Sequence, residues 1–177
     1  ATKVFCDYFT QRDDMQGEDM VIVSPDVGNV KVANMYAGLL DSKLAIIDKR
    51  RESGTEVVSK RLIGSVEGKT VLMVDDMIST AGTICEAAKL VTEKGATKVI
   101  AAATHGVCVG PAIERINSSP ISEVIITDTI APDSRLDDLG DKLHVLSVAR
   151  FLGEAVHRIH PHMSISSLFN HGEGPKK

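Results

Sequence analysis

Two adjacent carboxylates followed by a short, hydroxyl-rich loop form the pattern with the clearest chemistry in this sequence. The segment Val71–Ile84 begins with four apolar residues, continues with Asp75 and Asp76, and then passes through Ser79-Thr80-Ala81-Gly82-Thr83. A short apolar run bounded by polar residues is typical of a strand that is buried on both faces. From Ile84 to Gly95 the apolar residues have helical spacing, and glycine is a common residue just after a helix. The pattern therefore predicts a strand, a loop and a helix in direct succession.

This loop has the groups that bind a phosphorylated sugar. Backbone N–H groups at a helix N-terminus bind phosphate, and the hydroxyls of Thr80 and Thr83 lie in the same stretch. Asp75 and Asp76 could hold two adjacent sugar hydroxyls or a metal-bound sugar beside that phosphate. Helix capping alone explains one acidic or hydroxyl residue, but not two carboxylates, two threonines and a glycine so close together. We therefore expect a site that fits ribose 5-phosphate.

A basic segment is a second candidate for chemistry. Residues 49–61 contain five basic and two acidic side chains and begin with Lys49-Arg50-Arg51, directly after a predicted strand. A loop with Lys and Arg can close over phosphates and stabilise charge on a transferring group. A basic loop taken alone is more often solvated surface, so its position after a strand is the reason to consider it.

A third candidate is Asp26, in the turn Ser24-Pro25-Asp26-Val27-Gly28. At a strand end its carboxylate could hold Mg²⁺, usually through water. On local grounds, an Asx-turn role for Asp26 is equally plausible. His105 also follows a predicted strand, but a hydrogen-bonded histidine at a strand end is more common than a general base.

The elements that must position these residues alternate between strands and helices. Strands are predicted at 21–24, 44–48, 71–76, 99–104, 124–127 and 143–147, and helices at 32–40, 84–95, 110–117 and 148–160. This alternation predicts an α/β fold with a mostly parallel sheet and helices on both faces. Ligands in such folds bind beyond the carboxyl ends of the strands, where Asp26, Lys49, Asp75, Asp76 and His105 all fall.

Size and composition set limits on the protein class. A chain of 177 residues can bury one sizeable core, and 43% hydrophobic with 25% charged residues is ordinary for a soluble globular protein. The absence of tryptophan and the net charge of −4 argue against a nucleic-acid surface. No long apolar span and no secretory signal is present, and the three cysteines lack a zinc-binding spacing, so we expect reduced thiols and a cytoplasmic location without membrane contact.

The form Asp75-Asp76-Met-x-x-Thr80-x-Gly82-Thr83-Ile84 resembles the phosphoribosyl-diphosphate loop of type I phosphoribosyltransferases, and most closely that of ribose-phosphate pyrophosphokinases. The resemblance continues from about residue 21 to residue 169. It implies a type I phosphoribosyltransferase-like domain at 21–169, which is the second of two similar domains in that family. Residues 1–20 are expected to be an irregular lead-in, and residues 170–177 a tail.

The resemblance also implies an activity and a site. Family members use Mg²⁺ and transfer diphosphate from ATP to ribose 5-phosphate, giving phosphoribosyl diphosphate and AMP, and they are usually oligomers, commonly hexamers. By resemblance, Lys49 and Arg51 act on the transferring group and Asp26 contacts the metal. The ribose 5-phosphate-binding set is Arg51, Asp75, Asp76, Ser79, Thr80, Ala81, Gly82 and Thr83.

The sequence departs from the family pattern in two respects. Ser79 stands where the family loop usually has a third aspartate, and the chain matches only the second domain, whereas the first normally brings the main ATP-binding segments. We therefore expect this chain alone to bind ribose 5-phosphate but to be inactive or impaired as a kinase. Two alternatives stay open: a stand-alone type I phosphoribosyltransferase, and a non-catalytic regulatory subunit of the synthetase.

Overall fold

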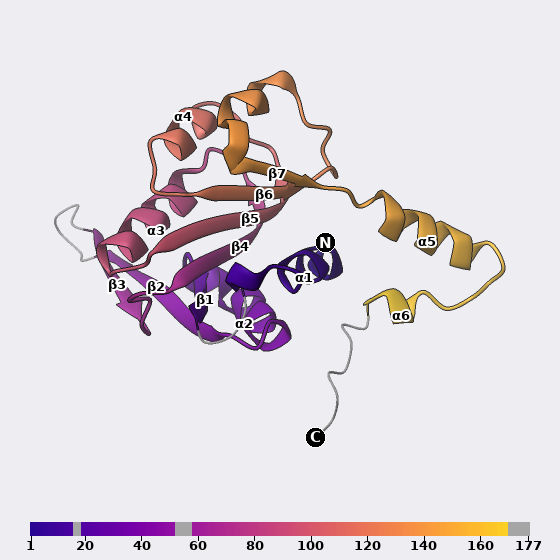
Figure 1. Ribbon diagram of the computed structural model, residues 1–177, viewed down its shortest axis with the longest axis horizontal. Coiled ribbons are helices and arrows are strands. Elements are labelled where there is room, and N and C mark those ends of the chain that lie inside the picture. The colour runs from indigo at the N-terminus through magenta and orange to yellow at the C-terminus, as the bar shows by residue number, and fades with distance from the viewer. Residues whose placement is uncertain (16–18, 52–57, 170–177) are drawn as a thin grey trace.

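A seven-stranded sheet forms the centre of the protein, as the computed structural model in Figure 1 shows. The structure describes residues 1–15, 19–51 and 58–169, with the backbone alone at residues 50, 51 and 58–60. The strands are β1 (Met20–Ser24), β2 (Lys43–Arg51), β3 (Val58–Ile63), β4 (Thr70–Ile78), β5 (Lys98–Gly106), β6 (Glu123–Thr127) and β7 (Leu143–Leu146). The α-helices are α1 (Thr2–Phe9), α2 (Val30–Leu39), α3 (Gly82–Glu93), α4 (Ala112–Asn117), α5 (Ala149–Ile159) and α6 (Ser166–Phe169), and the 3-10 segments are η1 (Asp13–Met15), η3 (Val27–Asn29) and η4 (Ser134–Lys142).

The strand order is β3-β2-β1-β4-β5-β6-β7, and every neighbouring pair is parallel except β2 with β3. Helices cover both faces of this sheet (Figure 1). One core cluster joins α1 and α2 to the sheet and contains Phe5, Phe9 and Tyr36. The other joins α3 and α4 to the opposite face and contains Ile84, Val91 and Ile116. The predicted α/β fold with helices on both faces is therefore confirmed.

Central strands are buried along their length because both faces are covered. In β4 the residues from Val71 to Val74 are all buried, and burial decreases only at Asp75. The same change occurs in β5 near His105. The apolar part of each strand therefore ends where the polar candidates begin, at the carboxyl edge of the sheet.

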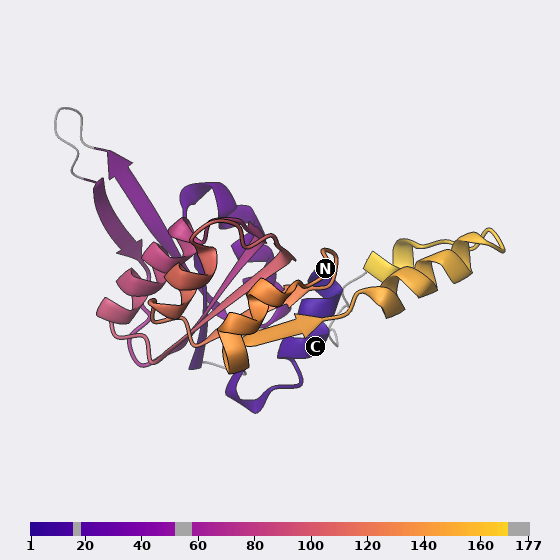
Figure 2. The ribbon, with the colours of Figure 1, turned by 90° about the horizontal axis from the view of Figure 1, so that it is seen from above.

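The segment after residue 48 differs from the expected loop. Lys49 and Arg51 lie within β2, which pairs antiparallel with β3 from Ile46↔Ile63 to Arg51↔Val58. This hairpin projects from one side of the molecule in Figure 2. Pairing with β3 extends the strand beyond the apolar run that predicted it, because backbone hydrogen bonds in a hairpin do not require apolar side chains. Residues 52–57 of the basic segment lie outside the described residues.

Residues 1–15 contain α1 and η1 rather than the irregular lead-in that we expected. Thr2–Phe9 form α1, which buries Phe5 and Phe9 against Tyr36 of α2. The sequence gives little indication of this helix, because only two of its residues, Phe5 and Phe9, are buried, and they stand four positions apart. The expected tail at 170–177 lies outside the described residues.

At the other end of the chain, α5 and α6 extend away from the sheet as an arm, seen on the right of Figures 1 and 2. The helix α5 has no buried residue, and Leu152, Val156 and Ile159 are exposed. The arm contacts itself through the rings of Phe151 and Phe169, whose centroids are 5.6 Å apart. No helix among the described residues is long and apolar enough to cross a membrane.

Candidate functional site

Three neighbouring strands bring the predicted residues together at the carboxyl edge of the sheet. The strand β4 pairs with β1 on one side and with β5 on the other. Asp26 follows β1, Asp75 lies near the end of β4, and the loop from Ser79 leads directly into α3. Because parallel strands all end at the same edge, residues far apart in the sequence become neighbours there.

A cavity of about 170 Å³ lies at this edge. Its walls are Asp26, Asp75 and every residue from Met77 to Ile84. The structure therefore places seven predicted site residues around one space: Asp26, Asp75, Ser79, Thr80, Ala81, Gly82 and Thr83. Met77, Ile78 and Ile84 also line the cavity, and the sequence analysis gave none of them a binding role.

Helix α3 presents unpaired donors to this cavity. Its N-cap Ala81 makes no side-chain capping bond and has φ 58° and ψ 9°, in the left-handed region. Within the described part of the chain, the backbone N–H groups of Ala81, Gly82 and Thr83 donate to no other group. The first N–H groups of a helix have no partner within the helix and lie at the positive end of its dipole. An anion in the cavity would satisfy them.

The loop is held by the segment that follows β5. The backbone N–H of Cys108 donates to the Ile78 carbonyl over 2.9 Å, and that of Val109 donates to the Ser79 carbonyl over 3.0 Å. From α4, Nη1 of Arg115 donates to the Thr80 carbonyl over 2.9 Å. Sequence reasoning missed Arg115, because nothing in a short helix 35 residues away indicates contact with this loop.

The two neighbouring aspartates differ in their environment. Asp75 is half-buried, and its Oδ1 accepts the backbone N–H of Asp76 over 2.8 Å. Burial raises the pKa of Asp75, and the negative charges of Asp76 and Asp26 raise it further. Asp76 is exposed and does not line the cavity, as expected for successive residues of a strand.

Asp26 serves the turn and also borders the cavity. One carboxylate oxygen, Oδ1, accepts the backbone N–H of Asn29 over 3.0 Å, and Nδ2 of Asn29 donates to the Val74 carbonyl of the neighbouring strand. The Asp26 side chain therefore caps η3, through the N–H three residues on rather than the N–H two residues on that an Asx turn uses. Among the described residues, no group of three His, Cys, Asp or Glu side chains is arranged to hold a metal.

Lys49, one of the two predicted catalytic residues, does not line this cavity. Its Nζ is 3.8 Å from Oε2 of Glu86 on α3. The side chain of Arg51 lies outside the described residues. His105 has a partner, since its Nδ1 is 2.9 Å from Oγ1 of Thr129.

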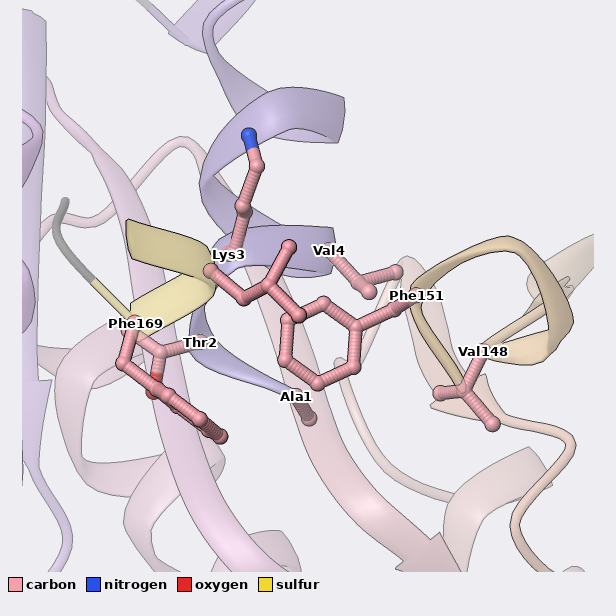
Figure 3. A pocket seen from close by; sticks show the side chains of 8 residues that line it. Ala1, Thr2, Lys3, Val4, Val148, Phe151 and Phe169 are labelled. Atoms are coloured by element: carbon pink, nitrogen blue, oxygen red, sulfur yellow. The ribbon is translucent and has the colours of Figure 1, made fainter. Parts of the chain in front are cut away.

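A second cavity, of about 80 Å³, is shown in Figure 3. It is lined by the start of α1 together with Val148, Phe151 and Phe169 from the two ends of the arm. Its walls are mostly apolar, and it contains no residue with a predicted role. The cavity at the end of β4 is the candidate site because the predicted residues line it.

Comparison with known proteins supports the family resemblance that the loop between β4 and α3 indicated. Residues 55–170 match the family described as phosphoribosyl synthetase-associated domain. A ribose-phosphate pyrophosphokinase of Caldanaerobacter subterraneus is 47% identical over 167 residues, covering 94% of this chain and 51% of the relative. Ribose-phosphate pyrophosphokinase 1 of Listeria monocytogenes is 46% identical over 170 residues, covering 96% of this chain and 52% of the relative.

Structural comparison agrees. The crystal structure of phosphoribosylpyrophosphate synthetase from Mycobacterium smegmatis superimposes with a TM-score of 0.81 at 40% identity, covering 92% of this chain and 51% of the other. The chain therefore spans about half the length of the relatives that it matches. Since the family match covers more than half of its residues, the chain belongs to the phosphoribosyl synthetase-associated domain family, and its relatives are ribose-phosphate pyrophosphokinases.

Proposed function

We propose that this chain is the ribose 5-phosphate-binding half of a ribose-phosphate pyrophosphokinase, which transfers diphosphate from ATP to ribose 5-phosphate. One observation carries the proposal: Ala81, Gly82 and Thr83, whose backbone N–H groups have no acceptor among the described residues, line the same cavity as Asp75. The N–H groups and the Ser79, Thr80 and Thr83 hydroxyls would bind the 5-phosphate. Asp75, with Asp76 at the exposed strand end, would accept hydrogen bonds from the ribose hydroxyls.

The acidic side of the cavity is compatible with Mg²⁺. Asp26 and Asp75 provide oxygen ligands of the kind that Mg²⁺ prefers, and the Asp26 carboxylate has a second oxygen besides the one that Asn29 uses. A bound divalent cation would offset the repulsion that contributes to the raised pKa of Asp75. Mg²⁺ would supply charge neutralisation for the phosphates, and Asp26 would hold it, usually through water.

Lys49 and Arg51 are the proposed catalytic side chains, with Arg51 also a ribose 5-phosphate ligand. Both lie in β2, and the ion pair with Glu86 puts Lys49 beside α3, the helix whose first residues line the cavity. The ion pair of Lys49 with Glu86 is long and partly exposed, so it is a weak restraint that Lys49 can leave for a phosphate. We also propose that the protein assembles as a homo-oligomer.

Calorimetric titration of the chain with ribose 5-phosphate tests the binding role. We expect the wild type to bind ribose 5-phosphate and not unphosphorylated ribose. Thr83→Val keeps the shape of the side chain and removes one hydroxyl, so affinity should fall about tenfold, as for one lost hydrogen bond to a charged group. Thr92→Val is the matched control, since Thr92 is exposed at the other end of α3. Absence of binding by the wild type, or equal affinity of Thr83→Val, would contradict the proposal.

A further inference from the structure

Arg115 contacts the loop at residues 79–81, between β4 and α3, without lining the cavity. Its Nη1 donates to the Thr80 carbonyl over 2.9 Å, and a Cβ placed on Gly82 would be 3.4 Å from the same atom. Arg115 is nevertheless not one of the residues that line the cavity. The guanidinium therefore contacts the loop without bordering the space where a ligand would sit.

The hydrogen bond from Arg115 to the Thr80 carbonyl also restrains the Ala81 N–H, because both groups belong to one rigid peptide bond. No peptide bond among the described residues is cis, so the carbonyl of Thr80 and the N–H of Ala81 lie in one plane and point in opposite directions within it. With the carbonyl directed at Arg115, the N–H of Ala81 must point away from Arg115. Ala81 itself lines the cavity, and its N–H has no acceptor among the described residues. The N–H is therefore aimed at the anion site.

Ala81 occupies a conformation that alanine disfavours. Its φ of 58° brings Cβ close to the backbone, a cost that glycine does not have. Rotation of the Thr80–Ala81 peptide would let Ala81 return to negative φ, and would also turn its N–H away from the cavity. Some contact must hold the strained form in place.

The neighbouring contacts do not provide this restraint. The backbone bonds from Cys108 and Val109 hold Ile78 and Ser79, so they end one residue before the peptide in question. The carbonyl of Ala81 accepts the N–H of Cys85, which fixes the plane after Ala81 but not the plane before it. Among the described residues, Arg115 makes the hydrogen bond that fixes the Thr80–Ala81 plane.

We propose that Arg115 is a positioning residue, which holds the Thr80–Ala81 peptide so that the Ala81 N–H points into the phosphate site. The inference rests on the proposed function, since it assigns a device to that same site. It gives α4 a role in ligand affinity although no residue of α4 lines the cavity.

A double-mutant cycle on the complete chain tests this role, with inorganic phosphate and ribose 5-phosphate as probes in calorimetry. Arg115→Met should weaken binding of both about tenfold, and Arg115→Lys should recover part of the loss. In the Ala81→Gly background the same Arg115→Met change should weaken binding by about threefold or less, because glycine has no strain to release. Unchanged affinity in Arg115→Met, or an equal loss in both backgrounds, would overturn the positioning role of Arg115.

Two further measurements separate the possible causes. Arg135→Met removes one positive charge from an exposed arginine that pairs with Asp133, and it should leave affinity unchanged. Crystal structures of the ligand-free chains show the orientation of the Thr80–Ala81 peptide directly. We expect φ of Ala81 to be positive in the wild type and negative in Arg115→Met. A positive φ in Arg115→Met would refute the inference even if the wild type bound no ligand, whereas absence of ligand binding alone would count against the proposed function.

Discussion

At the scale of a single residue, the environment of Asp75 opposes stability at neutral pH. The carboxylate is half-buried and lies near those of Asp76 and Asp26, so its pKa is raised, first by burial and then by these charges. A pKa that is higher in the folded chain than in the unfolded one means that folding favours the protonated carboxyl. The contribution of Asp75 to stability is therefore most favourable at low pH and is lost as pH rises through the raised pKa.

Asp75→Asn should stabilise the ligand-free chain at pH 7, by roughly 0.5–1 kcal/mol, the usual range for relieving an unfavourable functional group. Asparagine keeps an oxygen that can accept the Asp76 N–H and removes the charge. The gain should shrink as pH falls through the raised pKa of Asp75, and should be lost below the ordinary aspartate pKa, where the carboxyl is protonated in both the folded and the unfolded chain. Urea unfolding at several pH values measures it, with Asp138→Asn as an exposed control that should change little. Lower stability of Asp75→Asn at pH 7 would contradict this account.

At the scale of elements, a charged cluster fastens the amino-terminal segment to the edge of the sheet. Arg12 follows α1, and its guanidinium makes a bidentate contact with Glu123 at the start of β6, with Nη2 and Oε1 2.9 Å apart. Nζ of Lys98 in β5 contacts both Glu123 and Asp14. These hydrogen bonds, Arg12 first, lower the pKa of Glu123 to about 2. The cluster lies at the end of the strands opposite the candidate site, so it serves the fold rather than the ligand.

Glu123→Gln should destabilise the chain by about 1–3 kcal/mol at pH 7, because two partly buried cations lose their carboxylate. A pKa that is lower in the folded chain adds stability above the ordinary glutamate pKa, and this contribution is lost as pH falls toward 2. The difference between wild type and Glu123→Gln in urea unfolding should therefore be largest near neutrality and small near pH 2. Glu93→Gln, at an exposed position in α3, should cause no such loss. A difference that does not depend on pH would exclude the linkage.

The elements that the sequence predicted well are those with a local signal. The strands β1, β4, β5 and β6 are buried on both faces, so their consecutive residues are apolar and predict a strand. The helical periodicity after residue 84 predicts α3 in the same local way. The β2–β3 hairpin is held by pairing between strands, and α1 by packing on α2, so their signals lie outside any short window. The contact of Arg115 with Thr80 escaped prediction for the same reason. The cavity residues were predictable because one strand–loop–helix segment supplies most of them.

At the scale of the whole molecule, the described residues form a small cavity at the sheet edge and an arm whose helix α5 buries none of its residues. The relatives are about twice as long, and half of each has no counterpart here. The helix α5 exposes apolar residues on a segment that extends away from the sheet (Figure 2). The cavity of about 170 Å³ is smaller than the roughly 300–1,000 Å³ typical of sites that enclose larger ligands. It suits a sugar phosphate better than a sugar phosphate together with a nucleotide.

This chain by itself should therefore bind ribose 5-phosphate without catalysing diphosphate transfer at a normal rate. Transfer requires ATP to be held in line with the anomeric hydroxyl, since positioning supplies much of the rate in phosphoryl transfer. Chromatographic detection of AMP after incubation with ATP, ribose 5-phosphate and Mg²⁺ measures the activity, with the full-length Listeria monocytogenes relative as positive control. We expect AMP formation to be absent or strongly reduced, whereas calorimetry on the same preparation shows ribose 5-phosphate binding. AMP release at the rate of the full-length relative would show that the half-length chain supplies the ATP site as well, and would overturn the assignment of only one substrate to it.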